Sequence, residues 1–274
     1  MKKEDFTFVI TTFHSEKILD ECIKNLPKEC KKIVIENSGN AKLKEYIEKK
    51  YKNLKCYVMD KNLGYGKANN FGINKSNTKY IFIINPDVIL RPDKFDEIIE
   101  NIQNEKFSIA APIEKNNKIS FKEKIQKVDK VKGFALIIRR DVALATPFDE
   151  NIFLYLEEID LCKRVRDNKG EILLINSQVE HLGGLSHGNK DDFEMEKSRN
   201  WHWMWSSFYF YKKHYGFAYG LIRTFPKLFS SILKYFYYKI VNKEKEREKY
   251  KMRYLGLINS YFLRKSHYRP YERK

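Results

Sequence analysis

The sequence has 274 residues, of which 42% are hydrophobic, and carries a formal net charge of +17. This length can bury a substantial core, either as one large domain or as one domain with an appendage. Four scattered cysteines, Cys22, Cys30, Cys56 and Cys162, form no Cys-x-x-Cys pair and lack zinc-site spacing, which excludes a zinc module and favours a reduced, cytosolic setting.

Strand and helix patterns alternate along the first 90 residues. The opening MKKED is too short and too acidic for a secretory signal. Helical patterns follow Ser15, begin at about Ala41, and follow the loop at Asn62. Short apolar runs predict strands at 6–10, 32–36, 55–59 and 80–84. This alternation predicts an α/β fold, with a parallel sheet, right-handed crossovers and helices on both faces.

The strand at 80–84 stops at the triplet Asn85-Pro86-Asp87. Proline ends ladder pairing, and Asp87 is left at the carboxyl end of the strand, where ligands bind in open α/β sheets. A carboxylate beside an amide oxygen can hold Mg²⁺ or Mn²⁺, and the cation can hold a diphosphate. The same triplet could instead be a turn that caps the next helix.

Two earlier features bear on nucleotide binding. Glu36, at the carboxyl end of the second predicted strand, is placed like the acid that contacts the nucleoside in dinucleotide-binding sheets. The loop that carries Gly64 and Gly66 is neither a Gly-x-Gly-x-x-Gly after the first strand nor a Walker P-loop. We therefore do not expect a nicotinamide-dependent enzyme or a P-loop NTPase.

Three acids, Glu157, Glu158 and Asp160, lie at the start of a predicted helix in the second half of the chain. The helix dipole favours acids there, which alone would explain them. Three carboxylates near a strand-end metal site would also raise at least one pKa, as a general base requires. Before them we predict a helix at 94–104, strands at 108–112 and 133–140, and a hairpin or mobile loop at 114–130.

His181 follows a late predicted strand at 171–175. A lone histidine is usually a packed or surface residue. A neutral imidazole beside a glycine pair could, however, complete the coordination of a cation already held by a carboxylate. His14 and His187 are weaker candidates for contact with a diphosphate.

The basic character belongs to the end of the chain. From Trp201 onward there are 17 Lys and Arg against four Asp and Glu, a net charge of +13. Apolar residues recur there at helical spacing, and Pro226 and the interspersed charges exclude a simple bilayer-spanning helix. The segment suits either a bilayer interface or packing against the rest of the chain or a dimer partner. We expect one domain at 1–200 and a basic, aromatic-rich helical extension at 201–274.

Several motifs, in order, resemble the family 2 glycosyltransferases of the GT-A fold, particularly the rhamnosyltransferase-like branch that builds bacterial surface polysaccharides. The resemblance covers roughly residues 6–215. The motifs are Thr11-Thr12, Ile35-Glu36-Asn37-Ser38, Asn62-Leu-Gly64-x-x-x-Ala68-x-Asn70-x-Gly72, Asn85-Pro86-Asp87, Glu157-Glu158-x-Asp160-Leu-Cys162 and His181. The resemblance implies a Rossmann-like, mostly parallel sheet with helices on both faces, plus a C-terminal helical extension.

The resemblance also implies roles for individual residues. Asp87 and His181 would hold Mg²⁺ or Mn²⁺, and Gly133 and Phe134 would lie on the acceptor side. The residues that would bind the nucleotide sugar are Thr11, Thr12, Glu36, Asn62, Gly64, Lys67, Asn70, Asn85 and Asp87. These assignments predict a metal-dependent enzyme with one site at the edge of the sheet.

Glu158 would be the catalytic base, with Glu157 and Asp160 as neighbouring acids. Here the sequence departs from the family, which has Asp in place of Glu158, and catalysis is sensitive to the placement of such a carboxylate. The implied reaction is an inverting transfer of rhamnose or a similar hexose from a nucleotide diphosphate to a hydroxyl of a glycan or lipid-linked acceptor. Deoxythymidine diphosphate rhamnose is the first candidate donor, and a uridine diphosphate sugar is the second.

The expected setting is cell-surface polysaccharide synthesis, such as that of O-antigen or cell wall, by a cytoplasmic protein that is peripheral at the inner face of the membrane. The extension would bind the membrane surface or support a homodimer, and no nucleic acid is expected as a partner. Two alternatives remain. One is a sugar-nucleotide binder that is inactive because of Glu158. The other is a nucleic-acid-binding protein that uses the basic, aromatic extension.

Overall fold

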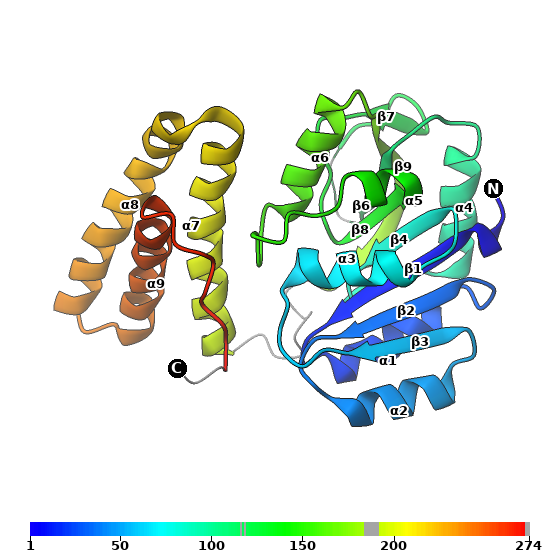
Figure 1. Ribbon diagram of the computed structural model, residues 1–274, viewed down its shortest axis with the longest axis horizontal. Coiled ribbons are helices and arrows are strands. Elements are labelled where there is room, and N and C mark those ends of the chain that lie inside the picture. The colour runs from blue at the N-terminus through cyan, green and yellow to red at the C-terminus, as the bar shows by residue number, and fades with distance from the viewer. Residues whose placement is uncertain (116, 118, 184–191, 272–274) are drawn as a thin grey trace. The chain divides into compact units, whose positions relative to one another are not determined.

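The structure, a computed structural model, describes residues 1–115, 117, 119–183 and 192–271 (Figure 1). The chain divides into two compact units. The α/β unit consists of Met1–Asp149 and Glu158–Lys190, and the helical unit consists of Glu150–Glu157 and Asp191–Lys274. The chain therefore leaves the α/β unit after residue 149 and returns to it at residue 158.

Four parallel strands form one half of the sheet. Their order is β3-β2-β1-β4, so that β1 pairs with both β2 and β4. Their bounds are Phe6–Thr12 for β1, Lys31–Glu36 for β2, Leu54–Val58 for β3 and Tyr80–Ile84 for β4. Because the strands are parallel, their carboxyl ends meet at one edge of the sheet. The predicted α/β class is confirmed.

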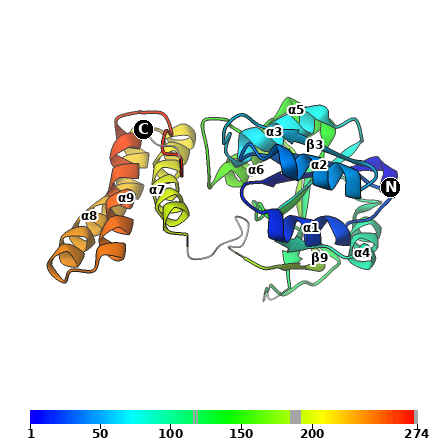
Figure 2. The ribbon, with the colours of Figure 1, turned by 90° about the horizontal axis from the view of Figure 1, so that it is seen from below.

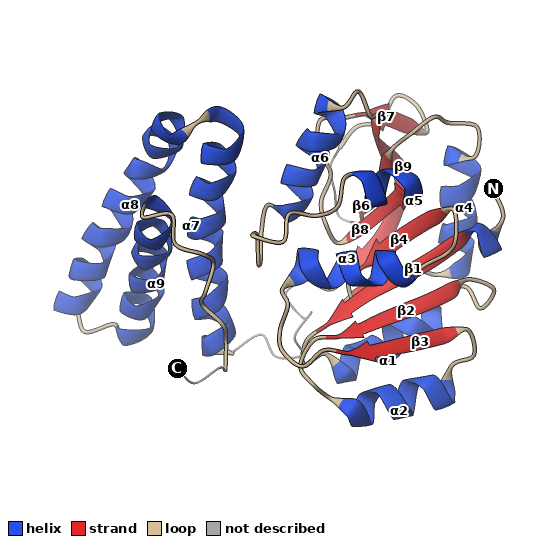
Figure 3. Cartoon of the chain, viewed as in Figure 1, coloured by secondary structure: helices blue, strands red, loops and turns tan. Residues whose placement is uncertain are grey.

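The sheet continues from β4 through antiparallel β8, and its full order is β3-β2-β1-β4-β8-β6-β9-β5. The remaining strands are β5 Val88–Ile89, β6 Ile109–Glu114, β7 Ile125–Lys127, β8 Ala135–Arg139 and β9 Ile172–His181. The short strand β7 lies in the segment predicted as a hairpin or loop, and pairs with β9. Strand β9 runs past the predicted end at residue 175 and pairs with β5 at its far end. Figure 3 shows the strands of the α/β unit in red.

Helices cover both faces of the sheet because the buried strands are apolar on both sides. Alternate residues point to opposite faces, so on β1 Phe8 joins one core layer and Val9 joins the other. Figure 2 shows α1 and α4 on the side of the sheet opposite to α3 and α5. The helices are α1 Glu16–Asn25, α2 Ala41–Lys50, α3 Tyr65–Lys75, α4 Pro92–Ile102, α5 Arg140–Ala145 and α6 Glu157–Asp167, with a 3-10 turn η1 at Lys3–Asp5.

Helix α3 lies unusually close to the central strand. A Cβ atom on Gly72 would be 2.5 Å from Val9 Cγ1, a distance that real Cβ contacts do not show. At the other end of the helix, Gly64 precedes α3 with a φ of 80°, in the left-handed region that favours glycine. Gly72 therefore allows α3 to pack closely on β1, and Gly64 allows the turn by which the chain enters the helix.

The helical unit contains α7 Phe193–Tyr215, α8 Phe217–Ile240 and α9 Glu244–Tyr261. Helix α7 packs against both others, and Trp201 and Trp205 of α7 form an apolar cluster with Met252 of α9. Residue 200, where the composition of the sequence changes, lies inside α7. Of the helices that the structure describes, none combines the length and apolar character that crossing a bilayer requires.

The segment 150–157 belongs to the helical unit although it precedes α6 in the sequence. Ser206 Oγ donates a hydrogen bond of 2.9 Å to the carbonyl oxygen of Leu154. The guanidinium of Arg269 lies 3.7 Å from the centre of the Phe153 ring. Contacts within the helical unit therefore hold this segment on both its backbone and its side chains.

Candidate active site

Strands β5 and β9 join two parts of the chain that the sequence singled out. Val88 pairs with His181, and the N–H of Leu182 donates to the carbonyl oxygen of Asp87 at 2.9 Å. This ladder places His181 Nε2 3.5 Å from Asp87 Oδ1. The carboxylate of Asp87 is fully buried. The structure thus brings the predicted carboxylate and imidazole together.

A second carboxylate lies against His181. Glu114 Oε1 is 3.4 Å from His181 Nδ1, and Glu114 also accepts a 2.8 Å hydrogen bond from Lys132 Nζ. The adjacent Asp87 carboxylate raises the pKa of His181, and the charge of Glu114 adds to this effect, while Lys132 lowers the pKa of Glu114. Sequence analysis missed Glu114. Its position just after the predicted strand at 108–112 is the signal that could have found it.

The residues near Asp87 fit a divalent cation shared with a ligand. The Asp87 carboxylate and the His181 imidazole, 3.5 Å apart, are groups that would hold such a cation together. Asn85 lies two residues before Asp87, and its buried Oδ1 has no hydrogen-bond partner among the described residues. Within those residues, no group of three or more His, Cys, Asp and Glu side chains could hold a metal ion. The cation would therefore need further oxygens, as Mg²⁺ commonly takes from phosphates.

A cavity of about 200 Å³ lies beside two residues that contact His181. Glu114, Phe134 and Glu158 are among the residues that line it. The Phe134 ring is stacked on the His181 imidazole, with ring centres 4.8 Å apart and planes inclined by 13°. Glu114 and Phe134 therefore connect the Asp87–His181 pair with the cavity that Glu158 lines.

Glu158 is half-buried in the first turn of α6. Burial raises the pKa of its carboxyl group, against the opposing effects of nearby backbone N–H groups and the charge of Lys130. A Cβ atom on Gly133 would lie 3.4 Å from both Cβ and Cγ of Glu158. Tyr65 holds Gly133 in place, because its hydroxyl donates to the Gly133 carbonyl oxygen at 2.6 Å. Gly133 thus lies directly against the glutamate side chain.

The other two acids of α6 have different surroundings. Asp160 is fully buried and accepts a 2.7 Å hydrogen bond from Arg164 Nε, four residues later in the helix. Glu157 is also buried. Neither belongs to the lining of the 200 Å³ cavity within the part of the chain that the structure describes. Of the three acids, Glu158 is therefore the one that reaches the cavity.

Glu36 lies at the carboxyl end of β2 and holds the turn that follows. Its Oε1 accepts from the backbone N–H of Ser38 at 3.0 Å, and its Oε2 accepts from that of Asn40 at 2.6 Å. The loops after β2 and β3 are joined by Asn37, whose Nδ2 donates to Asn62 Oδ1 at 2.9 Å. Glu36 and Asn62 therefore shape this edge of the sheet through contacts with the protein itself.

The end of β1 and helix α3 present polar atoms at the same edge. Thr11 Oγ1 donates to Asn69 Oδ1 at 3.0 Å, while Asn69 Nδ2 and Thr12 Oγ1 are buried without a hydrogen-bond partner among the described residues. Leaving such an atom unpaired costs about 1–3 kcal/mol, which a bound ligand would recover. Asn70 instead clamps the backbone of Phe148 with two hydrogen bonds of 2.9 Å. Sequence analysis missed Asn69. Its position beside Asn70, which the sequence did single out, is the signal that could have found it.

The remaining predicted residues lie on the loops or beyond the described chain. Gly64 is buried at the start of α3, and Lys67 is exposed one turn into that helix. His14 is exposed just after β1, with a φ of 52°. His187 lies outside the described residues. The structure therefore places Gly64 and Lys67 in the loop and first turn that follow β3.

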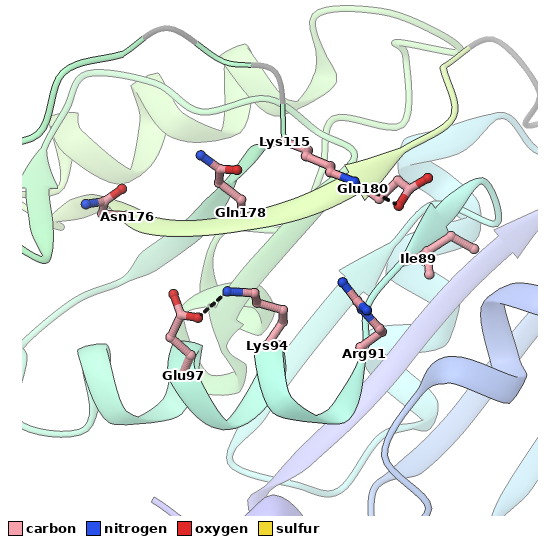
Figure 4. Close-up of a pocket in the computed structure, with 8 residues that line it drawn as sticks. All are labelled: Ile89, Arg91, Lys94, Glu97, Lys115, Asn176, Gln178 and Glu180. Atoms are coloured by element: carbon pink, nitrogen blue, oxygen red, sulfur yellow. Dashed lines mark hydrogen bonds and ion pairs between the residues drawn. The ribbon is translucent and has the colours of Figure 1, made fainter.

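A second cavity, of about 260 Å³, lies between α4 and the outer face of β9 (Figure 4). Glu180 lines it, whereas the next residue, His181, faces the other side of the strand. Lys115 approaches Glu180 to 3.7 Å, and Lys94 pairs with Glu97 of the same helix at 2.6 Å. This cavity shares no described residue with the one that Glu158 lines.

The curated relatives of this chain include a hexosyltransferase and a rhamnosyltransferase. The low-salt glycan biosynthesis hexosyltransferase Agl10 of Haloferax volcanii is 22% identical over 192 residues, which are 60% of this chain and 62% of that protein. The rhamnosyltransferase WbbL of Escherichia coli (strain K12) is 23% identical over 199 residues, 57% of this chain and 75% of that protein. The chain thus spans about three fifths of the length of the first relative.

Among solved structures, the mannosyltransferase PcManGT from Pyrobaculum calidifontis, in complex with GDP-Man and Mn²⁺, superposes with a TM-score of 0.59. The match covers 95% of this chain and 88% of that one at 9% identity, so it shows the GT-A fold alone. The sequence profile described as glycosyl transferase family 2 matches residues 7–154, more than half of the chain. The chain therefore belongs to glycosyl transferase family 2.

Proposed function

We propose that this protein moves rhamnose or a similar hexose from a nucleotide-diphosphate donor to a hydroxyl of a glycan or lipid-linked acceptor, with inversion at the anomeric carbon. The observation that carries the proposal is the continuity of the site. Asp87 and His181 lie 3.5 Å apart, and Glu114 and Phe134 connect them to the cavity lined by Glu158. The names of the two curated relatives, a hexosyltransferase and a rhamnosyltransferase, support the class of sugar.

The donor would bind at the carboxyl edge of the parallel strands. Thr12 and Asn69 offer buried polar atoms there, and Asn85 offers a third. Glu36 and Asn62 would act by holding the loops around the nucleoside, since their side chains are engaged by those loops. The proposed donor-binding set is Thr11, Thr12, Glu36, Asn62, Gly64, Lys67, Asn69, Asn85 and Asp87, whereas the amide of Asn70 is engaged by the backbone of Phe148.

Asp87 and His181 would hold Mg²⁺ or Mn²⁺ together with oxygens of the donor diphosphate. When bound, such a cation neutralises charge on the departing nucleoside diphosphate. The two protein groups would then fix the diphosphate end of the donor beside the cavity. Phe134, stacked on His181, would keep the imidazole in the orientation that points Nε2 at Asp87.

Glu158 would take the proton from the acceptor hydroxyl. The hydroxyl oxygen attacks the anomeric carbon, a new C–O bond forms, and the bond to the diphosphate oxygen breaks with its electron pair leaving on the diphosphate. Glutamate is one methylene longer than the aspartate of the family motif, and its side chain packs against Gly133. Gly133 and Phe134 would border the acceptor, because both lie against the cavity or against Glu158 itself.

The first test separates a transferase from a protein that only binds donors. A thermal-shift screen of deoxythymidine and uridine diphosphate sugars, with and without Mn²⁺, identifies the donor, since a ligand at 100 times its Kd adds about 2.7 kcal/mol of stability. With that donor, Glu158→Gln should keep the shift and lose about 10²–10⁴-fold in turnover. The control Glu171→Gln removes an exposed carboxylate that pairs with Lys127, outside the cavity.

Two results would count against the proposal. A donor-dependent shift without any transfer by the unmodified protein would indicate a sugar-nucleotide binder. Equal turnover of Glu158→Gln and Glu171→Gln would remove Glu158 from the reaction. The setting that we propose is cell-surface polysaccharide synthesis at the inner face of the cytoplasmic membrane, where a lipid-linked acceptor would be found.

A further inference from the structure

Helix α8 faces the rest of the helical unit with three small or polar residues and with Leu221 and Leu228, which are partly buried against an apolar cluster of α7 and α9. Gly220, Thr224 and Ser231 are its buried residues. Thr224 Oγ1 donates to the Gly220 carbonyl oxygen at 2.7 Å and lies 2.9 Å from the hydroxyl of Tyr261 in α9. A Cβ atom on Gly220 would come within 2.9 Å of the Phe208 ring in α7. A helix on the surface of a globular protein usually buries most of its large apolar side chains.

A second set of large apolar side chains on α8 points outward. They recur every three or four residues, so they form one stripe along the helix. Their exposed fractions lie between 54% and 83%. The members of this apolar stripe are Ile222, Phe225, Phe229, Leu233, Phe236 and Ile240. A contiguous exposed apolar patch rimmed by polar residues marks an interaction surface, unlike apolar residues scattered singly.

The charged residues of α8 are all positive. The helix contains Arg223, Lys227, Lys234 and Lys239 and no aspartate or glutamate. At about 100° per residue, the first three of these lie on one flank of the apolar stripe and Lys239 lies on the other. Cations therefore border the stripe on both sides.

A bilayer with anionic headgroups matches both properties of this face. Acyl chains accommodate an apolar stripe, and anionic headgroups attract the cations that flank it. A second copy of the chain matches less well. Two α8 helices placed stripe to stripe would bring four cations near four others, with no acid on either helix to offset them.

We propose that α8 is a membrane-docking helix that lies in the plane of an anionic bilayer. The apolar stripe enters the boundary between headgroups and acyl chains, and the flanking cations contact the headgroups. This inference rests on the proposed function only for the membrane setting, and it does not depend on the transfer reaction. It adds to the proposed function by naming the helix that would bind the membrane. It assigns binding to one face of one helix.

The test is co-sedimentation of the full chain with vesicles, without donor or acceptor. We expect binding to vesicles of phosphatidylcholine mixed with phosphatidylglycerol, weaker binding to phosphatidylcholine alone, and release at high salt. The double variant Phe225→Ser/Phe229→Ser should bind the mixed vesicles at least about tenfold more weakly, because both rings are exposed in solution and would be buried in the bilayer. Lys234→Glu/Lys239→Glu should show a similar loss.

Leu144→Ser is the matched control, because Leu144 of α5 is an exposed apolar residue outside the helical unit. Its binding should equal that of the unmodified protein. Circular dichroism of each variant shows whether the fold is kept. Equal vesicle binding by Phe225→Ser/Phe229→Ser and the unmodified protein overturns the proposal, as does a lipid-free dimer that this double variant abolishes. Binding that behaves as expected, without sugar transfer, would contradict only the proposed function.

Discussion

Burial and a nearby lysine act on the carboxyl group of Glu158 in opposite directions. Burial raises its pKa, and the charge of Lys130 lowers it, with the net result above the ordinary value. A base must be ionised to accept a proton, so turnover should fall as the pH drops through this pKa. Because the pKa is raised, the acid limb of the pH–rate profile should lie at a higher pH than the ordinary glutamate pKa of about 4.3.

Lys130→Met tests this balance. Removing the positive charge takes away an interaction that favours the ionised carboxylate, so the pKa of Glu158 should rise further and the acid limb of kcat should move to higher pH. The measurement is kcat at saturating donor and acceptor across the acidic and neutral range. The control Lys127→Met removes a lysine that pairs with Glu171. An acid limb that stays in place in Lys130→Met would argue against Glu158 as the titrating base.

At the scale of single elements, α3 depends on a residue without a side chain where it crosses β1. In Gly72→Ala the added methyl group would meet Val9 Cγ1 at 2.5 Å, so the strand or the helix must shift. We expect a loss of about 1–3 kcal/mol in the free energy of unfolding, even though alanine favours a helix over glycine. Urea denaturation measures this loss.

The double variant Gly72→Ala/Val9→Ala identifies the cause. Removing the opposing methyl groups should make the two substitutions less costly together than the sum of their separate effects. Strict additivity would mean that the close approach of α3 to β1 does not explain the loss. Thermal-shift experiments with donor on the same variants would report whether the loop before α3 depends on this contact.

The elements that the sequence predicted best are those with a strong local pattern. The strands around 6–10 and 80–84 are short apolar runs buried on both faces, and such a run needs no knowledge of its partner. Strand β5 has only two residues, too few for any periodicity, and it forms because β9 passes beside it. The end of β9 alternates buried with exposed residues in the structure. Its formation also depends on partners, because it pairs with β5 and β6.

The same distinction applies to the candidate site. Asp87 stands out in the sequence because the triplet Asn85-Pro86-Asp87 follows an apolar run. Glu114 lies among lysines and becomes a neighbour of His181 only when β6 and β9 pair. The resemblance to a family supplied the link between Glu158 and the other residues, because nothing in the local pattern relates α6 to the end of β4. The engagement of both Glu36 oxygens by the following turn was also not visible in the sequence.

At the scale of the whole molecule, the segment 150–157 belongs to the helical unit and directly precedes the proposed catalytic base in the chain. Tyr155 and Leu156 both have a φ of 69°, a conformation that costs a non-glycine residue about 1–3 kcal/mol and persists only when its surroundings hold it. Ser206 and Arg269 of the helical unit supply contacts to this segment. Glu158 is the next residue after it in the chain.

Removing residues 192–274 should therefore separate binding from turnover. The proposed donor-binding residues lie in the α/β unit, so the shortened chain should still show a donor-dependent thermal shift. Transfer should fall at least about 100-fold, because a displacement of roughly 1 Å at a catalytic group has an effect of this size. Activity equal to that of the full chain would show that the segment holds Glu158 without its helical contacts.

The division of the chain also matters for exchanging parts between members of the family. The helical unit is built from two separate stretches, 150–157 and 191–274. A chimera with a foreign helical unit must therefore be spliced at both stretches. A hybrid joined only near residue 191 would pair the native short stretch with foreign helices that did not evolve to hold it.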